Sequence, residues 1–282
     1  MTAGARQARC CIPGRAGVTT GFTVAVAVVE AGMLLLALTL VVCAPGYPGN
    51  SAEAQPAMDA LARALTRATG APVQAVYEET AEGGLRRLAA ADAALLLAPL
   101  PFFLDHEAGQ SLTARLMAVP RGSAPLQRWT LVAGKERAQA LDGFAVQSTA
   151  GFSKRFVHAM AKPLERAQVI DSAAVLSGLR RAAGGEPLAV LLDGAQEKAL
   201  ATLPFAARLL PLFASAPVPV ALVATVGKRL DDRRWKAVHA ALLSLAGDPA
   251  AREALEGVQM SGFVALDSAA LSAARAAYQQ AR

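Results

Sequence analysis

One stretch near the start of the chain constrains the fold more than any other. The apolar run from Leu38 to Cys43 stops abruptly at a loop, residues 44–50, that holds two prolines and two glycines. Such a run predicts a buried strand, and such a loop is typical of a tight turn at a strand's carboxyl end. A helical pattern follows at once. Open α/β sheets bind ligands at this edge, where a helix amino terminus favours an anion.

The first half of the chain alternates between strand and helix patterns. Asn50 and Glu53 have the spacing of a capping box, and Gly70 is a typical helix end. Pro56 leaves two alternatives, a kinked first turn or a regular helix that starts at the proline. The next predicted elements are a strand at 73–77, a helix at 80–90, a strand at 93–98 and a loop at 99–103. This order predicts a parallel sheet with right-handed crossovers.

A second unit with the same plan opens at residues 141–143. Its predicted elements are a strand at 144–146, a hydroxyl-rich turn at 148–153, a helix at 153–160, a strand at 169–170, a helix at 173–183, a strand at 188–192 and a helix at 195–203. Extended runs are predicted at 115–119, 129–133, 209–215 and 220–226, and helices follow to 246, at 249–256 and at 269–280. The chain therefore predicts two α/β units with a polar turn after each strand.

Composition excludes some classes of function. The 282 residues are 54% hydrophobic, which is enough for two lobes with real cores. The net charge of +6 falls to +4 without residues 1–31, and no run of Lys and Arg occurs, so nucleic acid is not an expected partner. The loop at 44–50 matches neither a dinucleotide-binding turn nor a P-loop. Cys43, at the end of an apolar strand, is expected to be a buried small hydrophobe.

Residues 1–31 have the layout of a secretory leader. Three arginines precede an apolar run at 22–29, and Val29-Glu30-Ala31 fits a small-residue cleavage site. This predicts a periplasmic mature protein. Two alternatives stay open, an uncleaved membrane anchor spanning 21–42 and a misplaced start codon, although Glu30 near the centre of such an anchor is costly in lipid.

Nothing in the sequence predicts catalysis, a cofactor or a metal site. His158 and His239 fall within predicted helices, and His106 follows Asp105 in a loop. No G-x-S-x-G motif occurs, and no two histidines have metal-ligand spacing. An Asp105–His106 pair is the one weak catalytic candidate.

Four pieces of the chain, in order, resemble the phosphate/phosphite/phosphonate-type solute-binding proteins of ABC importers. They are residues 40–51, the run 91–98 with the aromatic loop behind it, residues 141–146 with the Ser/Thr helix start that follows, and residues 212–219 with the helices up to Gly262-Phe263. The resemblance implies a two-lobed, type II periplasmic-binding-protein-like α/β fold, each lobe a mainly parallel sheet flanked by helices. Lobe I would be 32–130 and 219–282, lobe II 131–218, with crossing hinge strands near 129–134 and 215–220.

The candidate ligand-binding residues follow the strand ends or match this family's pattern. Ser148, Thr149 and Ser153 match the helix start of the family's second lobe, and Tyr47 lies in the corresponding first-lobe loop. The full set is Tyr47, Gly49, Asn50, Ser51, Phe102, Ser148, Thr149, Ser153, Asp193 and Gln196. The serines, Asn50 and Asp193 could equally serve as helix caps. The loop at 99–103 departs from the family's pattern because it offers no hydrogen-bonding side chain, so a less polar solute also stays open.

The resemblance implies an extracytoplasmic, monomeric solute-binding protein that delivers a small, phosphate- or phosphonate-like anion to the membrane permease of an ABC importer. Two alternatives are kept. The first is a periplasmic sensor or accessory protein of the same fold, and the second is a small α/β enzyme that uses the same cleft. Fold alone does not decide among them.

Overall fold

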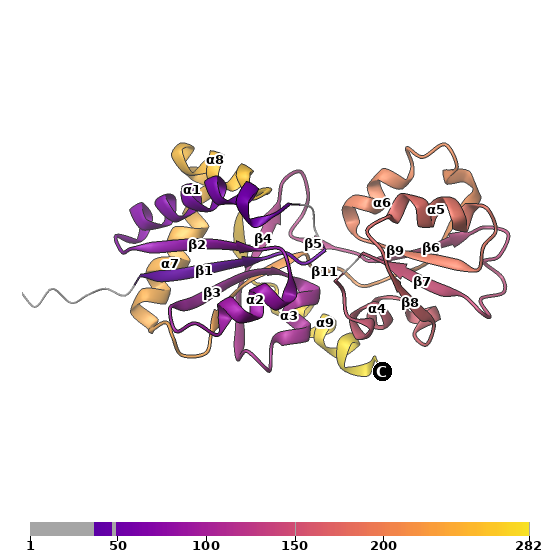
Figure 1. The fold of residues 1–282 in the computed structure, drawn as a ribbon, viewed down its shortest axis with the longest axis horizontal. Coiled ribbons are helices and arrows are strands. Elements are labelled where there is room, and N and C mark those ends of the chain that lie inside the picture. The colour runs from indigo at the N-terminus through magenta and orange to yellow at the C-terminus, as the bar shows by residue number, and fades with distance from the viewer. Residues whose placement is uncertain (1–36, 47–48, 150, 282) are drawn as a thin grey trace, which may run out of the picture. The chain divides into compact units, whose positions relative to one another are not determined.

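The computed structural model describes residues 37–46, 49–149 and 151–281 (Figure 1). The predicted leader and Tyr47 lie outside these residues. The described strands form a six-stranded sheet, a five-stranded sheet and a two-stranded ribbon. The six-stranded sheet contains, in spatial order, β13 (Met260–Ala265), β4 (Leu112–Pro120), β12 (Ala221–Val226), β3 (Ala93–Pro99), β1 (Leu38–Cys43) and β2 (Val73–Glu78).

β1 lies where the order of the first sheet reverses. It pairs in parallel with β2 on one side and with β3 on the other, while β12, β4 and β13 are antiparallel to their neighbours. The prediction of a parallel sheet therefore holds for the strands that alternate with helices. The loop after β1 lies at the topological switch point, which is where open α/β sheets bind ligands.

Helices cover both faces of the first sheet (Figure 1). One face packs on a core cluster with Met58, Leu61 and Leu242, contributed by α1 (Ser51–Thr69), α7 (Asp232–Ser244) and α8 (Pro249–Gly257). The other face is covered by α2 (Ala81–Leu88), α3 (Leu100–His106) and α9 (Ser268–Gln280). The short η3 (Leu245–Gly247) joins α7 to α8. Pro56 lies inside α1, which starts five residues earlier.

The five-stranded sheet carries the second lobe. Its order is β10 (Leu209–Ala214), β6 (Thr130–Gly134), β9 (Leu188–Leu192), β7 (Ala145–Ser148) and β8 (Gln168–Asp171), with β7 parallel to both β8 and β9. Its helices are α4 (Lys154–Met160), η1 (Lys162–Leu164), α5 (Val175–Ala183), α6 (Gly194–Leu200) and η2 (Ala206–Arg208). Leu179 and Phe205 pack on one face of this sheet and Phe156 on the other.

Two strands join the sheets. β5 (Leu126–Gln127) pairs antiparallel with β11 (Val218–Pro219), each in a segment that links one sheet to the other. The first crossing was predicted near 129–134, which is wrong, because residues 130–134 form β6 inside the second sheet. The second crossing, near 215–220, contains β11 as predicted. The lobe boundaries themselves stay a prediction.

The segment at 99–103 was predicted as a loop, and this is wrong. It begins α3, with Pro99 as N-cap and Pro101 in the first turn. A proline in the first helical turn removes an N–H that has no partner within the helix, so the Pro-Leu-Pro sequence that indicated a loop instead starts a helix. Strand β13 was missed because Gly262, with φ +158°, interrupts its apolar pattern.

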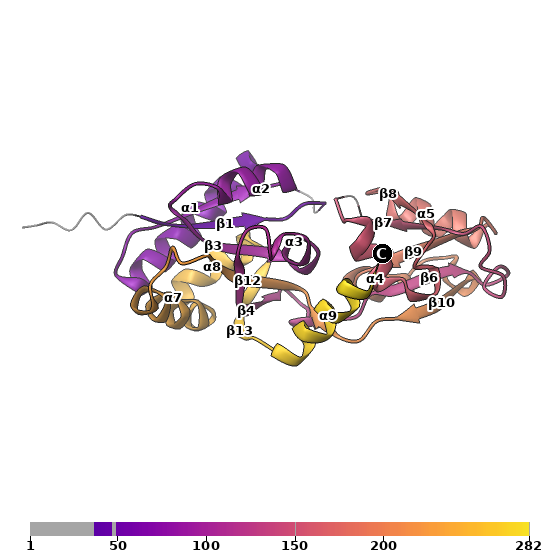
Figure 2. The ribbon, with the colours of Figure 1, turned by 90° about the horizontal axis from the view of Figure 1, so that it is seen from below.

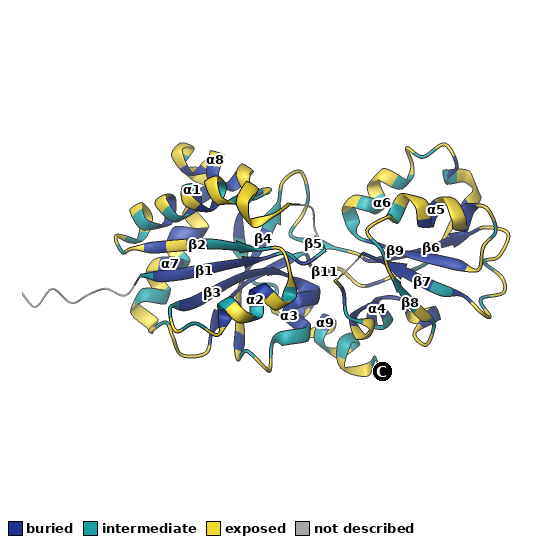
Figure 3. Cartoon of the chain, viewed as in Figure 1, coloured by how far each residue is buried: buried dark blue, intermediate teal, exposed yellow. Residues whose placement is uncertain are grey.

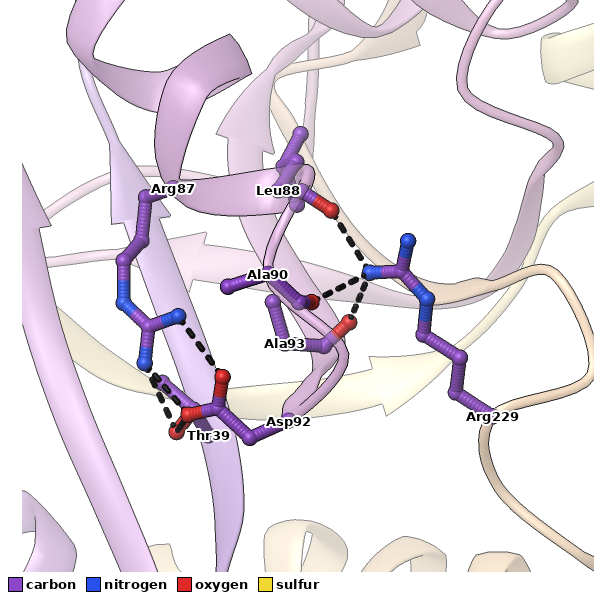
Figure 4. Close-up of polar contacts among 7 residues, drawn as sticks. All are labelled: Thr39, Arg87, Leu88, Ala90, Asp92, Ala93 and Arg229. Carbon is purple, nitrogen blue, oxygen red and sulfur yellow. Dashed lines mark hydrogen bonds and ion pairs between the residues drawn. The ribbon is translucent and has the colours of Figure 1, made fainter.

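A polar cluster closes the amino end of the first sheet (Figure 4). The Arg87 guanidinium donates to both carboxylate oxygens of Asp92 at 2.9 and 2.5 Å, and the Thr39 hydroxyl donates to Asp92 at 2.5 Å. These bonds hold the pKa of Asp92 well below its usual range, with the Arg87 bond the larger cause. Beside them, Arg229 Nη1 donates to the carbonyls of residues 88, 90 and 93 at 2.6–2.9 Å.

Cys43 is fully buried at the other end of β1, as predicted. A Cβ added to Gly84 would clash with its sulfur, so α2 packs on the thiol through a glycine. Burial raises the pKa of the Cys43 thiol to about 12. The inner strands β1, β3, β12, β6 and β9 are fully buried, the edge strand β8 is not, and the helices expose their outer faces (Figure 3). Within residues 37–281 as described, no helix is both long and apolar enough to span a membrane.

Candidate functional site

The predicted site residues follow the carboxyl ends of parallel strands in both sheets. Residues 49–51 come after β1, while Ser148 ends β7 and Asp193 follows β9. The loops after β1 and β7 approach each other, because a Cβ added to Gly151 would lie 3.4 Å from Gly46 N and from Pro45 Cβ. Two strand ends from different sheets therefore meet at one place.

The start of α1 is bound by a carboxylate of the chain itself. Asn50 is the N-cap and accepts from the Glu53 N–H at 2.9 Å. The Ser51 N–H and hydroxyl both donate to Oε2 of Glu79, at 2.6 and 2.7 Å, and the same hydroxyl lies 3.2 Å from the Tyr77 carbonyl. Glu79 therefore occupies the donors that were predicted to receive a solute anion.

Tyr77 is a first-lobe candidate that the sequence analysis missed. It lies in β2, and a Cβ on Gly49 would lie 3.6 Å from its hydroxyl oxygen, so the phenol faces the loop after β1. Burial, and then the charge of Glu79, raise the pKa of Tyr77. The phenol stays protonated at neutral pH and can donate a hydrogen bond.

Phe102 is buried in α3 with 4% of its surface exposed. Its ring packs against His106, with ring centroids 4.6 Å apart. Phe102 therefore supports the start of α3 from inside the core.

The carboxyl end of β7 carries two buried hydroxyls. Ser148 is fully buried and donates over 3.4 Å to the Thr149 carbonyl. Thr149 is 8% exposed, and its hydroxyl accepts a long bond of 3.5 Å from Gln196 Nε2. Two predicted residues from different loops, Thr149 and Gln196, are thus brought together.

Asp193 and Gln196 form a reciprocal capping box at the start of α6. Asp193 accepts from the N–H groups of residues 195 and 196, and the Gln196 side chain accepts from the Asp193 N–H. Gln127 of β5 also accepts from Gly194 N–H at 3.1 Å, which ties this helix start to the linking ribbon. The capping alternative kept for Asp193 is therefore realised.

Ser153 caps α4 and also bonds across to the first lobe. Its oxygen accepts from the Phe156 N–H at 3.1 Å, and its hydroxyl donates to Asp105 of α3 at 2.6 Å. The same Asp105 oxygen accepts from the Tyr278 hydroxyl of α9 at 2.6 Å. Burial, and then the bond to Asp105, raise the pKa of Tyr278 to about 12.

Each hydroxyl has only one proton to give, and this decides which predicted residues can donate to a solute. Ser51 faces Glu79 and the Tyr77 carbonyl, and Ser153 gives its proton to Asp105. Thr149 accepts from Gln196, and within the part of the chain that the structure describes its own proton has no acceptor. Thr149 is the best-placed solute donor of the three.

The catalytic candidate gains little support. Burial lowers the pKa of His106, and the ring contacts Phe102. Asp105 is engaged by Ser153 and Tyr278. Among the described residues, no group of three His, Cys, Asp or Glu side chains could hold a metal ion.

Tyr77, Glu79, Asp105, Gln127 and Tyr278 join the site without having been predicted as ligand-binding residues, although Asp105 was named as a weak catalytic candidate. Three of them carried a usable signal, since Tyr77 and Glu79 lie at the end of β2 and Asp105 lies soon after β3, on the same sheet edge. Gln127 and Tyr278 follow no parallel strand, and only the fold brings them there.

No protein-family model matches the chain, and no curated protein sequence matches it. Solved structures do match. XAC2383 from Xanthomonas citri, solved bound to ATP, is 16% identical, with 86% of this chain and 98% of that chain covered and a TM-score of 0.67. A binding protein component of an ABC phosphonate transporter from Pseudomonas aeruginosa is 14% identical, with 83% of each chain covered and a TM-score of 0.54.

PhnD1 from Prochlorococcus marinus, solved with methylphosphonate, is 11% identical, with 82% of this chain and 94% of that chain covered and a TM-score of 0.53. At these identities the likeness shows the fold and leaves the solute open. The predicted two-lobed, type II periplasmic-binding-protein fold is confirmed.

Proposed function

We propose that the chain is an extracytoplasmic solute-binding protein that binds a small solute between its lobes and presents it to the membrane permease of an ABC importer. Binding by lobe closure needs neither catalysis nor a cofactor. One structure with this fold is a binding protein component of an ABC phosphonate transporter, and another was solved in complex with methylphosphonate, which supports a solute-binding role here.

The observation that carries the proposal is the meeting of polar strand ends from two sheets. The loop after β1 and the turn after β7 approach each other at Gly46 and Gly151, and Thr149 directly follows the second of these strands. A solute placed there can be reached by groups from both sheets, as a closing two-lobed binder requires.

For the solute we propose a small oxyanion of the phosphate or phosphonate class. Tyr47, Gly49, Asn50 and Ser51 would contact it from the first lobe. The contacts proposed from the second lobe are Ser148, Thr149, Ser153, Asp193 and Gln196. An anion can use Ser51 or Ser153 only by replacing the carboxylate already bound there, so affinity depends on that exchange.

Calorimetric titration with inorganic phosphate and methylphosphonate tests this proposal. We expect binding by the unsubstituted protein, and a loss of about tenfold or more in Thr149→Ala, the value of one good hydrogen bond to a charged group. Thr113→Ala, on an exposed position of β4, is the matched control and should bind normally. If neither anion binds, the proposal of a phosphate- or phosphonate-like solute is refuted, and if Thr149→Ala binds as tightly as the parent, the proposed contact of Thr149 is refuted.

A further inference from the structure

One carboxylate, that of Asp105 in α3, bonds to two other helices that are far from it in the sequence. Asp105 lies in α3, on the first sheet, and accepts from Ser153 at the start of α4, on the second sheet. It also accepts from Tyr278 of α9, which follows the last strand of the first sheet. Both bonds are 2.6 Å long and end on the same oxygen.

A second set of contacts fixes α9 against α4. The Arg155 guanidinium lies 4.6 Å from the centre of the Tyr278 ring, and it donates to the carbonyls of Tyr278 and Gln279 at 3.0 and 3.3 Å. These carbonyls lie at the carboxyl end of α9, where a cation is favoured. Figure 2 shows α9 running from the side of β13 toward α4.

We propose that Asp105 is the centre of a latch that holds the second lobe against the first. The latch consists of Asp105, Ser153, Arg155 and Tyr278. It concerns how the lobes are held, so it does not depend on which solute binds.

The numbers of hydrogen-bond donors and acceptors explain why the latch requires the carboxylate of Asp105. A serine hydroxyl and a phenol each donate one proton, and a carboxylate oxygen has two lone pairs to receive them. An asparagine in this place offers a neutral oxygen or two N–H donors, and bonds to a charged acceptor are roughly twice as strong as neutral ones. Asp105→Asn therefore weakens both bonds with almost no change in size.

The chain offers a matched control two residues away. Glu107, at the end of α3, pairs with Arg275 of α9 through Nε–Oε2 at 2.9 Å and a second, shorter contact. This pair joins the same two helices as Asp105 and Tyr278 but does not involve α4. Glu107→Gln removes the same charge from the same helix and leaves the bond to the second lobe intact.

The test measures the distance between the lobes in the solute-free full chain. Spin labels go on exposed cysteines at Ala68→Cys in α1 and Ser177→Cys in α5, with Cys10 and Cys11 replaced by serine. Cys43 can stay because it is buried. Double electron–electron resonance then compares the parent with Asp105→Asn, Tyr278→Phe and Glu107→Gln.

We expect a longer-distance population in Asp105→Asn and, more weakly, in Tyr278→Phe, and the parent distribution in Glu107→Gln. Tyr278→Phe keeps the ring under Arg155, so it remains informative if Asp105→Asn folds poorly. The latch is refuted if the two variants superimpose on Glu107→Gln, whether all three match the parent or all three shift together. Because no solute is added, this outcome is separate from failure of the titrations.

Discussion

Similar side chains lie at the two ends of the first sheet but have different structural roles. At the amino end, Thr39, Arg87 and Asp92 bond to one another within one lobe. At the carboxyl end, Ser153 and Asp105 also form a hydroxyl–carboxylate bond, but this one joins α3 to a helix of the other sheet. The same chemistry therefore stabilises one lobe at the first end and connects two lobes at the second.

This difference shows that the role of a polar cluster depends on which end of the sheet it occupies. In an open α/β sheet, the carboxyl ends of the strands face the ligand and the amino ends do not. Substitutions at the amino end should lower stability and leave solute binding unchanged. Substitutions at the carboxyl end should change solute binding, with a loss of stability only where the residue also caps a helix, and the predictions below test that separation.

The largest expected effect is at the amino end. Arg229→Ala removes a guanidinium nitrogen that bonds three carbonyls, so it should lower the free energy of unfolding by about 2 kcal/mol, as for hydrogen bonds to a charged group. Urea unfolding at neutral pH measures this decrease in the free energy of unfolding. Arg233→Ala, on an exposed position of α7, is the control. Equal midpoints for the two variants would contradict the assignment.

Asp92→Asn should lower the free energy of unfolding by about 1.5 kcal/mol at neutral pH. Because the folded-state pKa of Asp92 is lowered, its contribution is present above the unfolded pKa of about 4 and is lost as the pH falls toward the folded value. Urea unfolding between pH 7 and pH 3 should show the parent and the variant converging. A gap that stays constant over this range would rule out the charge as its cause.

Glu79→Gln should raise the affinity for phosphate or methylphosphonate about tenfold, which corresponds to about 1.4 kcal/mol. The reason is that the carboxylate no longer competes for the Ser51 donors. Glu82→Gln, an exposed position in α2, is the matched control for the charge. Calorimetric titration that gives the same or weaker binding in Glu79→Gln would show that Glu79 does not exclude the anion.

The smallest effect is expected at Asn50, whose side chain caps α1. Asn50→Ala should lower the free energy of unfolding by about 1 kcal/mol. A capping role alone leaves solute affinity unchanged, whereas solute contact lowers it as well. Thermal unfolding and calorimetric titration on the same sample distinguish the two roles of this residue.

Much of the fold could be predicted because local patterns agree with it. β1, β3 and β9 are short apolar runs that end in turn residues, and Asn50 and Gly70 do bound α1. The prediction failed at α3, where two prolines start a helix, and at the first crossing. Pairing of β6 with β9 and β10 depends on distant strands, which local pattern does not encode.

The site was predictable in position and less so in detail. The strand-end rule placed Ser51 and Thr149 at the correct edges. It could not show that Glu79 and Asp105 bind the hydroxyls of Ser51 and Ser153, because each carboxylate lies 28 or 48 residues from its partner. Only the folded structure shows which carboxylate lies beside each of these hydroxyls.

The buried thiol of Cys43 has a consequence for the redox conditions that the folded protein can tolerate. Disulfide exchange requires a thiolate that can reach another sulfur, and this group is both shielded by α2 and held in its protonated form. In an oxidising compartment, the described part of the chain presents no sulfur for mispairing. We therefore expect Cys43 of the folded protein to stay a free thiol there.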